Sequence, residues 1–325
     1  MVYMKILYIG SKDTHEQYVR GLVPSHWLYG AVEMERDGHE VVWEQERGEL
    51  LHDWRLVRQY HPDYVFVPNL NLHNHLFLLA LAAIGICRVP IVAWLHHEPK
   101  AKKGLKAFMY RFLLSGCQHL FFLSHKTMEE TITHGLAKGC RCSEPGWGAD
   151  MEFFSKVEIT DGDTYVSTGK ENRDFDILIE AFQQTKAPLV IMTAKNHGGN
   201  NHEWLLKRCK EIPNIKVVIT ENTGDVYPRM LQEMARAKAL VCPLQKEKLN
   251  YCVGLSTIAD AEGLGKPLII TRNPYHSQER IKQFNTVVTL EEWVEAIKNI
   301  KKPHPSPLSM KQCWENMKPY FINIM

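Results

Sequence analysis

Apolar and amphipathic segments alternate along this chain in a pattern that predicts strands and helices. Short apolar runs bounded by glycine, proline or charged residues predict buried strands, and segments with helical apolar spacing separate them. The predicted strands of the first half are MKILYIG, EVVWEQ, HPDYVFVPN, PIVAWLHHEP and HLFFLS. Strands that alternate with helices favour a parallel sheet with right-handed crossovers and helices on both faces.

Two segments of the first half are predicted to be helices of contrasting character. Residues 26–39, HWLYGAVEMERDGH, predict a helix that ends at Gly38. Residues 76–87, LFLLALAAIGIC, are the most apolar segment, but they are too short to span a bilayer. We interpret them as a buried helix.

The strand–helix alternation lapses once and then restarts, which predicts two domains. The lapse is SEPGWGADMEFFSKVEITDGDT, residues 143–164, and the strands YVSTG, APLVIMTAK, IKVVITE, ALVCPL and KPLIITR follow it. A second break, PHPSP, precedes a terminal helix. We therefore expect an α/β protein with doubly wound, Rossmann-like domains at 1–150 and 151–305, and a helix at 306–325 that packs back toward the first domain.

Composition narrows the class of protein without identifying its chemistry. The chain has 325 residues, of which 45% are hydrophobic and 23% charged, as in ordinary globular proteins. A net charge of +2 gives no argument for nucleic acid as a partner. No signal peptide is visible, so we expect a cytoplasmic protein whose 8 cysteines are reduced core thiols. A metal site at Cys140 and Cys142 is disfavoured, because no second pair follows at zinc-site spacing.

The stretch YVSTGKENRDFDILIEAF carries the first candidate site. Gly169 ends a predicted strand, and Phe175 begins a helix with an apolar stripe. Lys170 and Arg173 would therefore lie near a helix N-terminus at the carboxyl end of a strand, where open α/β sheets bind anions. The alternative is a solvated turn that happens to carry charges.

The stretch GLSTIADAEGLGKPLIIT carries a second, more specific signal. Gly254 and Ser256 precede a helix whose first turn would present free N–H groups to an anion. Asp260 lies inside that helix, where its carboxylate could accept both hydroxyls of a ribose. GLGK is not a phosphate-binding Walker loop, because Pro267 replaces the required Ser or Thr. An ordinary helix with a glycine stop remains the alternative.

Together these stretches resemble the two donor-site motifs of GT-B-fold glycosyltransferases of the large family-4-like group. The connector FFLSHKTMEETITHGLAKGCRCSEPGWGADMEFF is similar to the bridge between the domains of that group. The resemblance implies two Rossmann-like domains that face each other across a cleft. It also implies transfer of a sugar from a nucleotide-diphosphate sugar, with retention of configuration and without a metal cofactor.

The resemblance also assigns roles to donor-site residues. Lys170 and Arg173 would hold the donor diphosphate beside the Gly169 turn. The backbone of Gly254, Leu255 and Ser256 would add donors to the phosphates or the sugar. Asp260 stands where the family has a ribose-binding Glu, and the region from Asn222 to Tyr227 would form the nucleobase pocket. Many members have a sugar-binding Glu eight residues before the ribose ligand, and here that position is Cys252.

The first domain supplies fewer candidates. Gly10 and Ser11 would face the cleft at the end of the first strand. His97 ends the fourth strand, where family members often carry a His near the donor sugar. His96 is the alternative, because adjacent residues of a strand point in opposite directions. Either His could instead be structural.

The segment KAKKGLKAFMYRFLLSG, residues 100–116, combines a basic run with Leu105, Phe108 and Phe112 at helical spacing. This pattern is typical of helices that lie on an anionic membrane, which would place the protein at its inner face. The alternative is a solvated helix face over an ordinary core. An acceptor carried on a lipid would suit the first interpretation, and a glycan or a small-molecule acceptor remains open.

Two other functions stay open beside glycosyl transfer. A GT-B nucleotide-sugar epimerase also holds a sugar nucleotide between two such domains. A non-catalytic partner subunit that binds sugar nucleotides is compatible with Cys252 and with the shortened carboxylate of Asp260.

Overall fold

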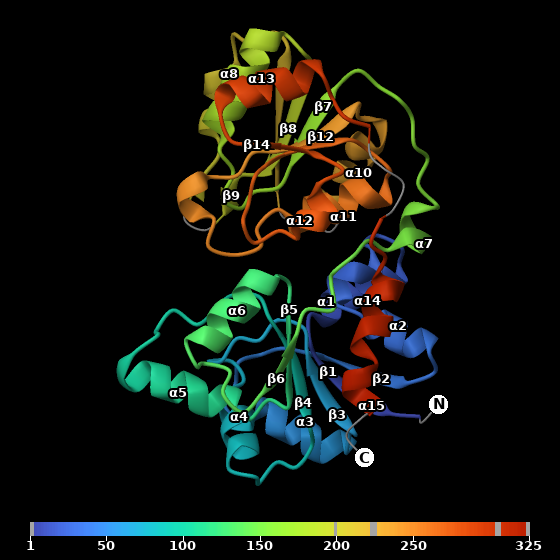
Figure 1. The fold of residues 1–325 in the computed structure, drawn as a ribbon. Coiled ribbons are helices and arrows are strands. Elements are labelled where there is room, and N and C mark those ends of the chain that lie inside the picture. The colour runs from blue at the N-terminus through green and yellow to red at the C-terminus, as the bar shows by residue number, and fades with distance from the viewer. Residues whose placement is uncertain (1–2, 198–199, 222–225, 303–306, 323–325) are drawn as a thin grey trace. The chain divides into compact units, whose positions relative to one another are not determined.

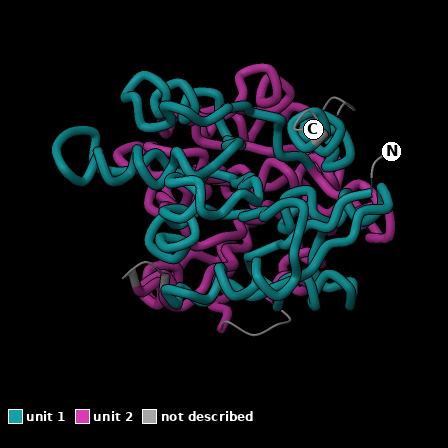
Figure 2. The backbone as a smooth tube through the Cα atoms, turned by 90° about the horizontal axis from the view of Figure 1, so that it is seen from below, with its two compact units in different colours: residues 1–148, 309–325 teal, residues 149–308 magenta. Residues whose placement is uncertain are grey.

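The computed structural model describes residues 3–197, 200–221, 226–302 and 307–322. The chain forms two compact units, which are coloured separately in Figure 2. Unit 1 comprises Met1–Gly148 and Ser309–Met325, and unit 2 comprises Ala149–Leu308. No helix in the described ranges is long and apolar enough to cross a membrane.

Unit 1 is built on a parallel sheet with the strand order β2-β1-β3-β4-β5-β6 (Figure 1). The strands are β1 (Lys5–Gly10), β2 (Glu40–Gln45), β3 (Tyr64–Val67), β4 (Ile91–Leu95), β5 (His119–Phe122) and β6 (Arg141–Ser143). Every residue of β3, β4 and β5 is buried, as expected for strands that are covered on both faces. The order reverses between β1 and β3, so the carboxyl ends of these two strands form the topological switch point of unit 1.

Helices cover both faces of this sheet. They are α1 (Lys12–Val19), α2 (Ala31–Arg36), α3 (His52–Tyr60), α4 (Leu76–Ala83), α5 (Gly104–Leu114), α6 (His125–Thr133), α14 (Met310–Met317) and α15 (Pro319–Ile322), with a 3-10 turn at Ser25–Leu28. One face of the strands packs against α3, α4 and α5 in a continuous core. The opposite face carries Phe66, Trp94 and Phe121, since alternate residues of a strand point to opposite sides.

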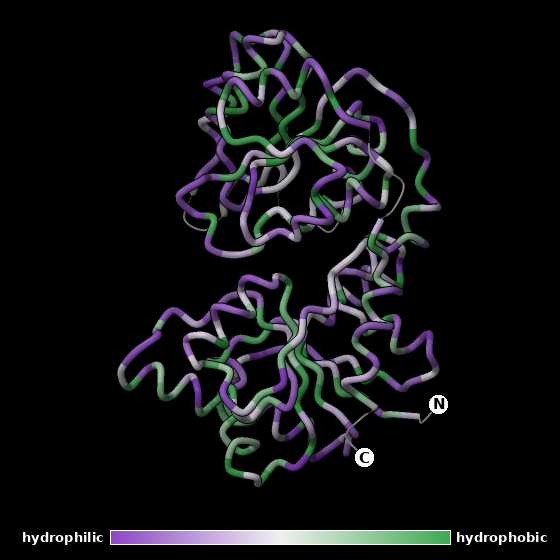
Figure 3. The backbone as a smooth tube through the Cα atoms, in the orientation of Figure 1, coloured by the Kyte–Doolittle hydropathy of each residue, from purple (hydrophilic) through white to green (hydrophobic). Residues whose placement is uncertain are grey.

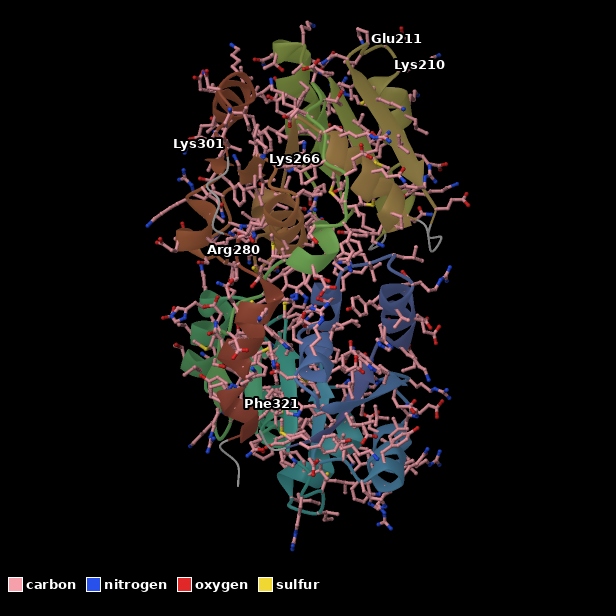
Figure 4. The ribbon with its side chains drawn as sticks, turned by 90° about the vertical axis from the view of Figure 1, so that its right-hand side faces the viewer. Lys210, Glu211, Lys266, Arg280, Lys301 and Phe321 are labelled. Atoms are coloured by element: carbon pink, nitrogen blue, oxygen red, sulfur yellow. The ribbon has the colours of Figure 1, made fainter. Side chains whose placement is uncertain are left out.

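The C-terminal segment completes that second face. Phe321, labelled in Figure 4, packs against Phe66 and Phe121 with ring centroids 6.2 and 6.3 Å apart. Trp314 Nε1 donates to Asp37 Oδ2 at 2.5 Å, and Lys318 Nζ lies 2.6 Å from the same oxygen. Residues 309–322 are therefore part of the core of unit 1.

Unit 2 repeats the architecture with the parallel order β11-β8-β7-β12-β13-β14. Its strands are β7 (Tyr165–Thr168), β8 (Leu189–Ala194), β11 (Ile215–Thr220), β12 (Ala239–Cys242), β13 (Leu268–Thr271) and β14 (Asn285–Val287), with a small hairpin of β9 (Asn196–His197) and β10 (Asn200–Asn201). Its helices are α7 (Met151–Phe154), α8 (Phe175–Thr185), α9 (Trp204–Cys209), α10 (Val226–Arg236), α11 (Leu255–Gly263), α12 (Gln278–Ile281) and α13 (Leu290–Lys298), with a 3-10 turn at Lys246–Lys248. The order reverses between β7 and β12, which sets the switch point of unit 2.

Hydrophobic strands lie inside each unit, and hydrophilic loops surround them (Figure 3). The predicted fold class, two doubly wound α/β domains with parallel sheets, is confirmed. The cysteines are all free, and six of the eight are buried.

Two helix predictions need correction. The helix expected at 26–39 is broken, because Tyr29 and Gly30 adopt left-handed conformations with φ of 55° and 97°. A 3-10 turn precedes this break and α2 follows it. The apolar helix α4 ends at Ala83, and Ile84 and Ile86 beyond it are each 58% exposed, so residues 76–87 are not buried throughout.

Candidate functional site

The two motifs singled out from the sequence meet at the switch point of unit 2. The turn of residues 169–174 follows β7, and the chain leaving β12 runs beside it. Arg173 forms an isolated antiparallel bridge with Leu244, and Asp174 N donates to Pro243 O at 3.1 Å. The crevice outside the carboxyl ends of the strands at such a point is where open α/β sheets bind ligands.

Gly169 permits the packing of this turn in two ways. Its φ of +103° is one that L side chains rarely adopt. A Cβ atom at this position would also lie 2.5 Å from Nη2 of Arg173. The glycine therefore makes room for the guanidinium against the end of β7.

Arg173 is a buried cation, with only 8% of its surface exposed. Nη1 donates to Glu171 O at 2.8 Å, and Nη2 donates to Thr168 O and Thr257 Oγ1, both at 3.4 Å. These acceptors are neutral, and Nε has no hydrogen-bond partner within the described ranges. Among the described carboxylates none forms an ion pair with Arg173. A buried charge without a counter-charge is unfavourable, and an anion at this point would relieve it.

The N-terminus of α11 lies next to this guanidinium, since Thr257 is the third residue of that helix. Gly254 is the N-cap, with φ of +88°, and no side chain caps the helix. The first-turn N–H groups, which belong to Leu255, Ser256 and Thr257, have no partner within the helix. A helix N-terminus with free amides and a partial positive charge favours an anion.

Lys170 adds a third positive element to the same turn. It follows Gly169 directly, is half-buried, and has no ion-pair partner within the described ranges. The structure thus brings Lys170, Arg173 and the α11 N-terminus into one small region of unit 2.

A polar network at this turn was missed by sequence reasoning. Tyr251 donates its hydroxyl hydrogen to Glu171 Oε1 and accepts from Asn172 Nδ2, the latter at 3.0 Å. Gln245 Nε2 donates to Arg173 O at 3.1 Å. The groups come from two loops about 75 residues apart, so no local pattern could reveal them.

Asp260 is buried inside α11 and already has a partner. Tyr227 donates its hydroxyl hydrogen to Asp260 Oδ1 at 2.7 Å. Burial raises the pKa of Asp260 to about 7, although the hydrogen bond from Tyr227 opposes that shift. Asn222, the other residue predicted for the nucleobase pocket, lies outside the described residues.

The loop before α11 is held in place by the segment that follows β13. Asn273 Nδ2 donates to the carbonyl oxygens of Tyr251 and Val253, and His276 Nε2 donates to Val253 O at 2.8 Å. Burial lowers the pKa of His276 to about 4, so its imidazole stays neutral at pH 7. Cys252, at the position of the expected sugar ligand, is buried in this loop.

A buried ion pair fixes the other end of α11. Arg280, labelled in Figure 4, donates from Nε and Nη2 to the two carboxylate oxygens of Glu262 at 2.9 and 2.6 Å. Arg280 is therefore neutralised, in contrast to Arg173.

In unit 1 the predicted residues lie at the corresponding switch point. Gly10 ends β1, and a Cβ atom there would lie 2.5 Å from Cγ of Pro68, which follows β3. Ser11 caps α1 and accepts from Thr14 N at 3.2 Å and from Thr14 Oγ1 at 2.7 Å. The hydroxyl of Ser11 thus has a structural partner.

The two adjacent histidines have different surroundings. His96 Nε2 donates to Pro68 O at 2.9 Å, and its ring lies 5.0 Å from that of Tyr29. Burial lowers the pKa of His96 to about 4. His97 is exposed. His96 therefore ties β4 to β3, while His97 remains the more accessible of the pair.

No known family model matches this sequence. No curated protein matches it either. Solved structures do match it in fold. A Listeria monocytogenes protein provisionally described as a UDP-N-acetylglucosamine 2-epimerase aligns with a TM-score of 0.58 and 10% identity, over 100% of this chain and 98% of its own.

Two further structures align over nearly the whole chain. AviGT4, a glycosyltransferase involved in avilamycin A biosynthesis, gives a TM-score of 0.52 at 12% identity, over 99% of this chain and 94% of its own. The UDP-GlcNAc 2-epimerase from Neisseria meningitidis, bound to UDP-GlcNAc, gives a TM-score of 0.52 at 9% identity, over 98% of this chain and 100% of its own. Likeness at such low identity establishes the fold. This chain has the GT-B-type fold that these glycosyltransferases and UDP-GlcNAc 2-epimerases share.

Proposed function

We propose that this protein is a glycosyltransferase that uses a nucleotide-diphosphate sugar as its donor. The observation that carries the proposal is Arg173, a buried guanidinium without a counter-charge among the described residues, beside the uncapped N-terminus of α11. This combination suits a diphosphate, because the guanidinium offers a planar set of donors and the helix offers backbone amides.

The proposed chemistry uses these groups to stabilise the leaving group. Negative charge builds on the diphosphate as the glycosidic bond breaks, and fixed donors at that point lower the barrier. Lys170 and Arg173 would supply the charge, and the amides of Leu255 and Ser256 would supply hydrogen bonds. The resemblance to family-4-like enzymes supports retention of configuration.

Protein groups carry the positive charge in this proposal, so turnover should survive EDTA. Loss of turnover in EDTA, restored by Mg²⁺ or Mn²⁺, would contradict the proposal.

Unit 1 would contribute the acceptor side of the reaction. Its switch-point edge carries Gly10 and Ser11, and the exposed His97 follows β4. We propose that His97 contacts the donor sugar or the acceptor, and that Asp260 contacts the ribose. The acceptor would be a glycan, a lipid-linked sugar or a small molecule.

The first test is the affinity for UDP, measured by calorimetry. Arg173→Ala and Lys170→Ala should each weaken binding about ten- to a hundredfold, since a charge-assisted phosphate contact contributes roughly 1.5–3 kcal/mol. Arg173→Lys should bind with intermediate affinity, because it keeps the charge and loses the planar fork.

The matched control is Arg229→Ala, which removes an exposed arginine from α10 of the same unit. It should bind UDP as tightly as the unaltered protein. Circular dichroism and urea unfolding identify any variant that has lost its fold. Unchanged UDP affinity in folded Arg173→Ala would remove the proposed diphosphate site.

A nucleotide-sugar epimerase is the second candidate, and the fold likeness to 2-epimerases favours it. The two reactions differ at carbon 2 of the sugar. Epimerisation there breaks a C–H bond, so UDP-N-acetylglucosamine incubated in D₂O without an acceptor should gain deuterium at carbon 2. A transferase should leave the donor without deuterium at carbon 2, and it should release UDP only when an added acceptor, or water in its place, takes the sugar. Tight binding with no turnover on any donor or acceptor would indicate a partner subunit.

A further inference from the structure

Helix α5 has two apolar faces, and the core of unit 1 uses one of them. Ala107, Leu113 and Leu114 are buried in that core. Four other apolar residues of the helix are exposed, at 76% for Leu105, 64% for Phe108, 46% for Met109 and 37% for Phe112. Their spacing of i, i+3, i+4 and i+7 places them on a single helix face. We call these four residues the apolar stripe.

The stripe does not cover the core of unit 1, and its four residues form a solvent-exposed face of α5. Helix α5 packs instead through its other side, close to α4. A Cβ atom at Gly116, just beyond α5, would lie 2.3 Å from Leu79 O of α4. In Figure 1, α5 lies at the outer flank of unit 1. Exposed apolar area gathered on one helix is unfavourable in water and points to a partner.

Basic side chains accompany the stripe. Residues 100–116 contain four lysines and one arginine and no Asp or Glu. Lys100, Lys103 and Lys106 are exposed, and we call them the basic flank. Lys102 pairs with Glu98, and Arg111 donates to His134 O at 3.1 Å, so those two charges have partners within the protein. A partner for this surface should offer apolar groups to the apolar stripe and anionic groups to the basic flank.

The area of the stripe distinguishes between kinds of partner. At about 200 Å² for a large side chain, the exposed fractions leave roughly 450 Å² of apolar surface. A stable protein interface buries about 800 Å² on each side, so this surface is small for a protein partner. A helix in a bilayer interface needs only one apolar face, which sinks about 5–10 Å into the boundary between headgroups and acyl chains.

We infer that α5 docks this protein on an anionic lipid bilayer. The apolar stripe enters the acyl boundary, and the basic flank contacts lipid phosphates. Helix α5 is 11 residues long and would lie in the plane of the membrane without crossing it. The inference goes beyond the proposed function, because it does not depend on which reaction unit 2 supports.

Vesicle sedimentation tests it directly. The probes are phosphatidylcholine vesicles, and vesicles in which about a third of the lipid is phosphatidylglycerol. The full-length protein should sediment with the anionic vesicles at low salt and be released at high salt, because salt screens the attraction. Leu105→Ser/Phe108→Ser/Phe112→Ser should lower the partition coefficient at least about tenfold. Lys103→Gln/Lys106→Gln should lower it about fivefold for each charge removed.

The control Val19→Ser/Leu206→Ser removes two exposed apolar side chains that lie outside α5. It should bind vesicles like the unaltered protein. UDP affinity is measured for every variant and should not change, which separates this inference from the diphosphate site. Absence of binding to anionic vesicles would overturn the inference, as would full binding by the stripe variant. Concentration-dependent dimerisation abolished by the stripe variant, without vesicle binding, would assign the stripe to self-association instead.

Discussion

At the scale of single residues, the candidate site depends on a small number of unusual positions. Arg173 is buried without a counter-charge, and Gly169 leaves the space that its guanidinium occupies. Asp260 carries a carboxyl whose pKa is displaced upward by burial. Each of these features has a consequence that can be measured without knowing the substrate.

Gly169→Ala should destabilise the protein and weaken UDP binding. The new methyl group would meet Arg173 Nη2, and the φ of +103° would be strained, so we expect a loss of about 1–3 kcal/mol in the free energy of unfolding. Gly139→Ala is the matched control, because Gly139 has φ of +94° with nothing within 4 Å of the added Cβ. Urea unfolding of both variants separates backbone strain from the clash. Equal losses of unfolding free energy in the two variants would show that the Arg173 guanidinium moves away from the new methyl group at little cost.

Asp260 should make stability depend on pH. Its pKa is about 7 in the folded state and about 3.9 in an unfolded chain. The folded protein therefore binds more protons between these values, and the stabilisation present below about pH 4 is lost as pH rises toward 7. Relative to Asp260→Asn, the unaltered protein should lose up to about 1.4 kcal/mol per pH unit in that window. Relative to Asp163→Asn, which loses an exposed carboxyl and keeps Asp260, the unaltered protein should show no such difference when urea unfolding is repeated at several pH values.

At the scale of elements, the sequence pattern located the long buried strands and missed the short or broken elements. β4 and β8 are continuous apolar runs, so their identity follows from local composition. β6 and β14 have three residues each, and their pairing depends on neighbours distant in sequence. The break at Tyr29 was also invisible, because a left-handed tyrosine has no local signature.

The candidate site shows the same division. The Gly169 and Gly254 turns could be predicted, since glycine at a strand–helix junction is a local signal. The pairing of Tyr227 with Asp260 could not, because tertiary packing brings α10 and α11 together. The sequence could not predict which face of α5 is exposed to solvent, because helical periodicity gives the spacing of an apolar stripe and not the direction in which it faces.

At the scale of the whole molecule, each unit has its own sheet and its own core. Each can therefore respond separately to a ligand. UDP should protect amides of unit 2 from hydrogen exchange, most strongly around residues 169–174 and the start of α11. Binding stabilises the state that binds by RT ln(1 + [L]/Kd), which is about 2.7 kcal/mol at a hundredfold excess over Kd. Exchange followed by mass spectrometry reports both units at once, and equal protection of β3 and β4 in unit 1 would contradict a diphosphate site confined to unit 2.

The division of unit 1 between the two ends of the sequence affects how the protein is made. Unit 2 is one continuous stretch, so a ribosome completes it while unit 1 still lacks residues 309–325. Until those residues emerge, Phe66 and Phe121 have no Phe321 to cover them. A chain that lacks everything beyond Leu308 would leave this aromatic surface exposed to water and to chaperones. The first unit to begin folding is therefore completed only after the whole of the second unit has been synthesised.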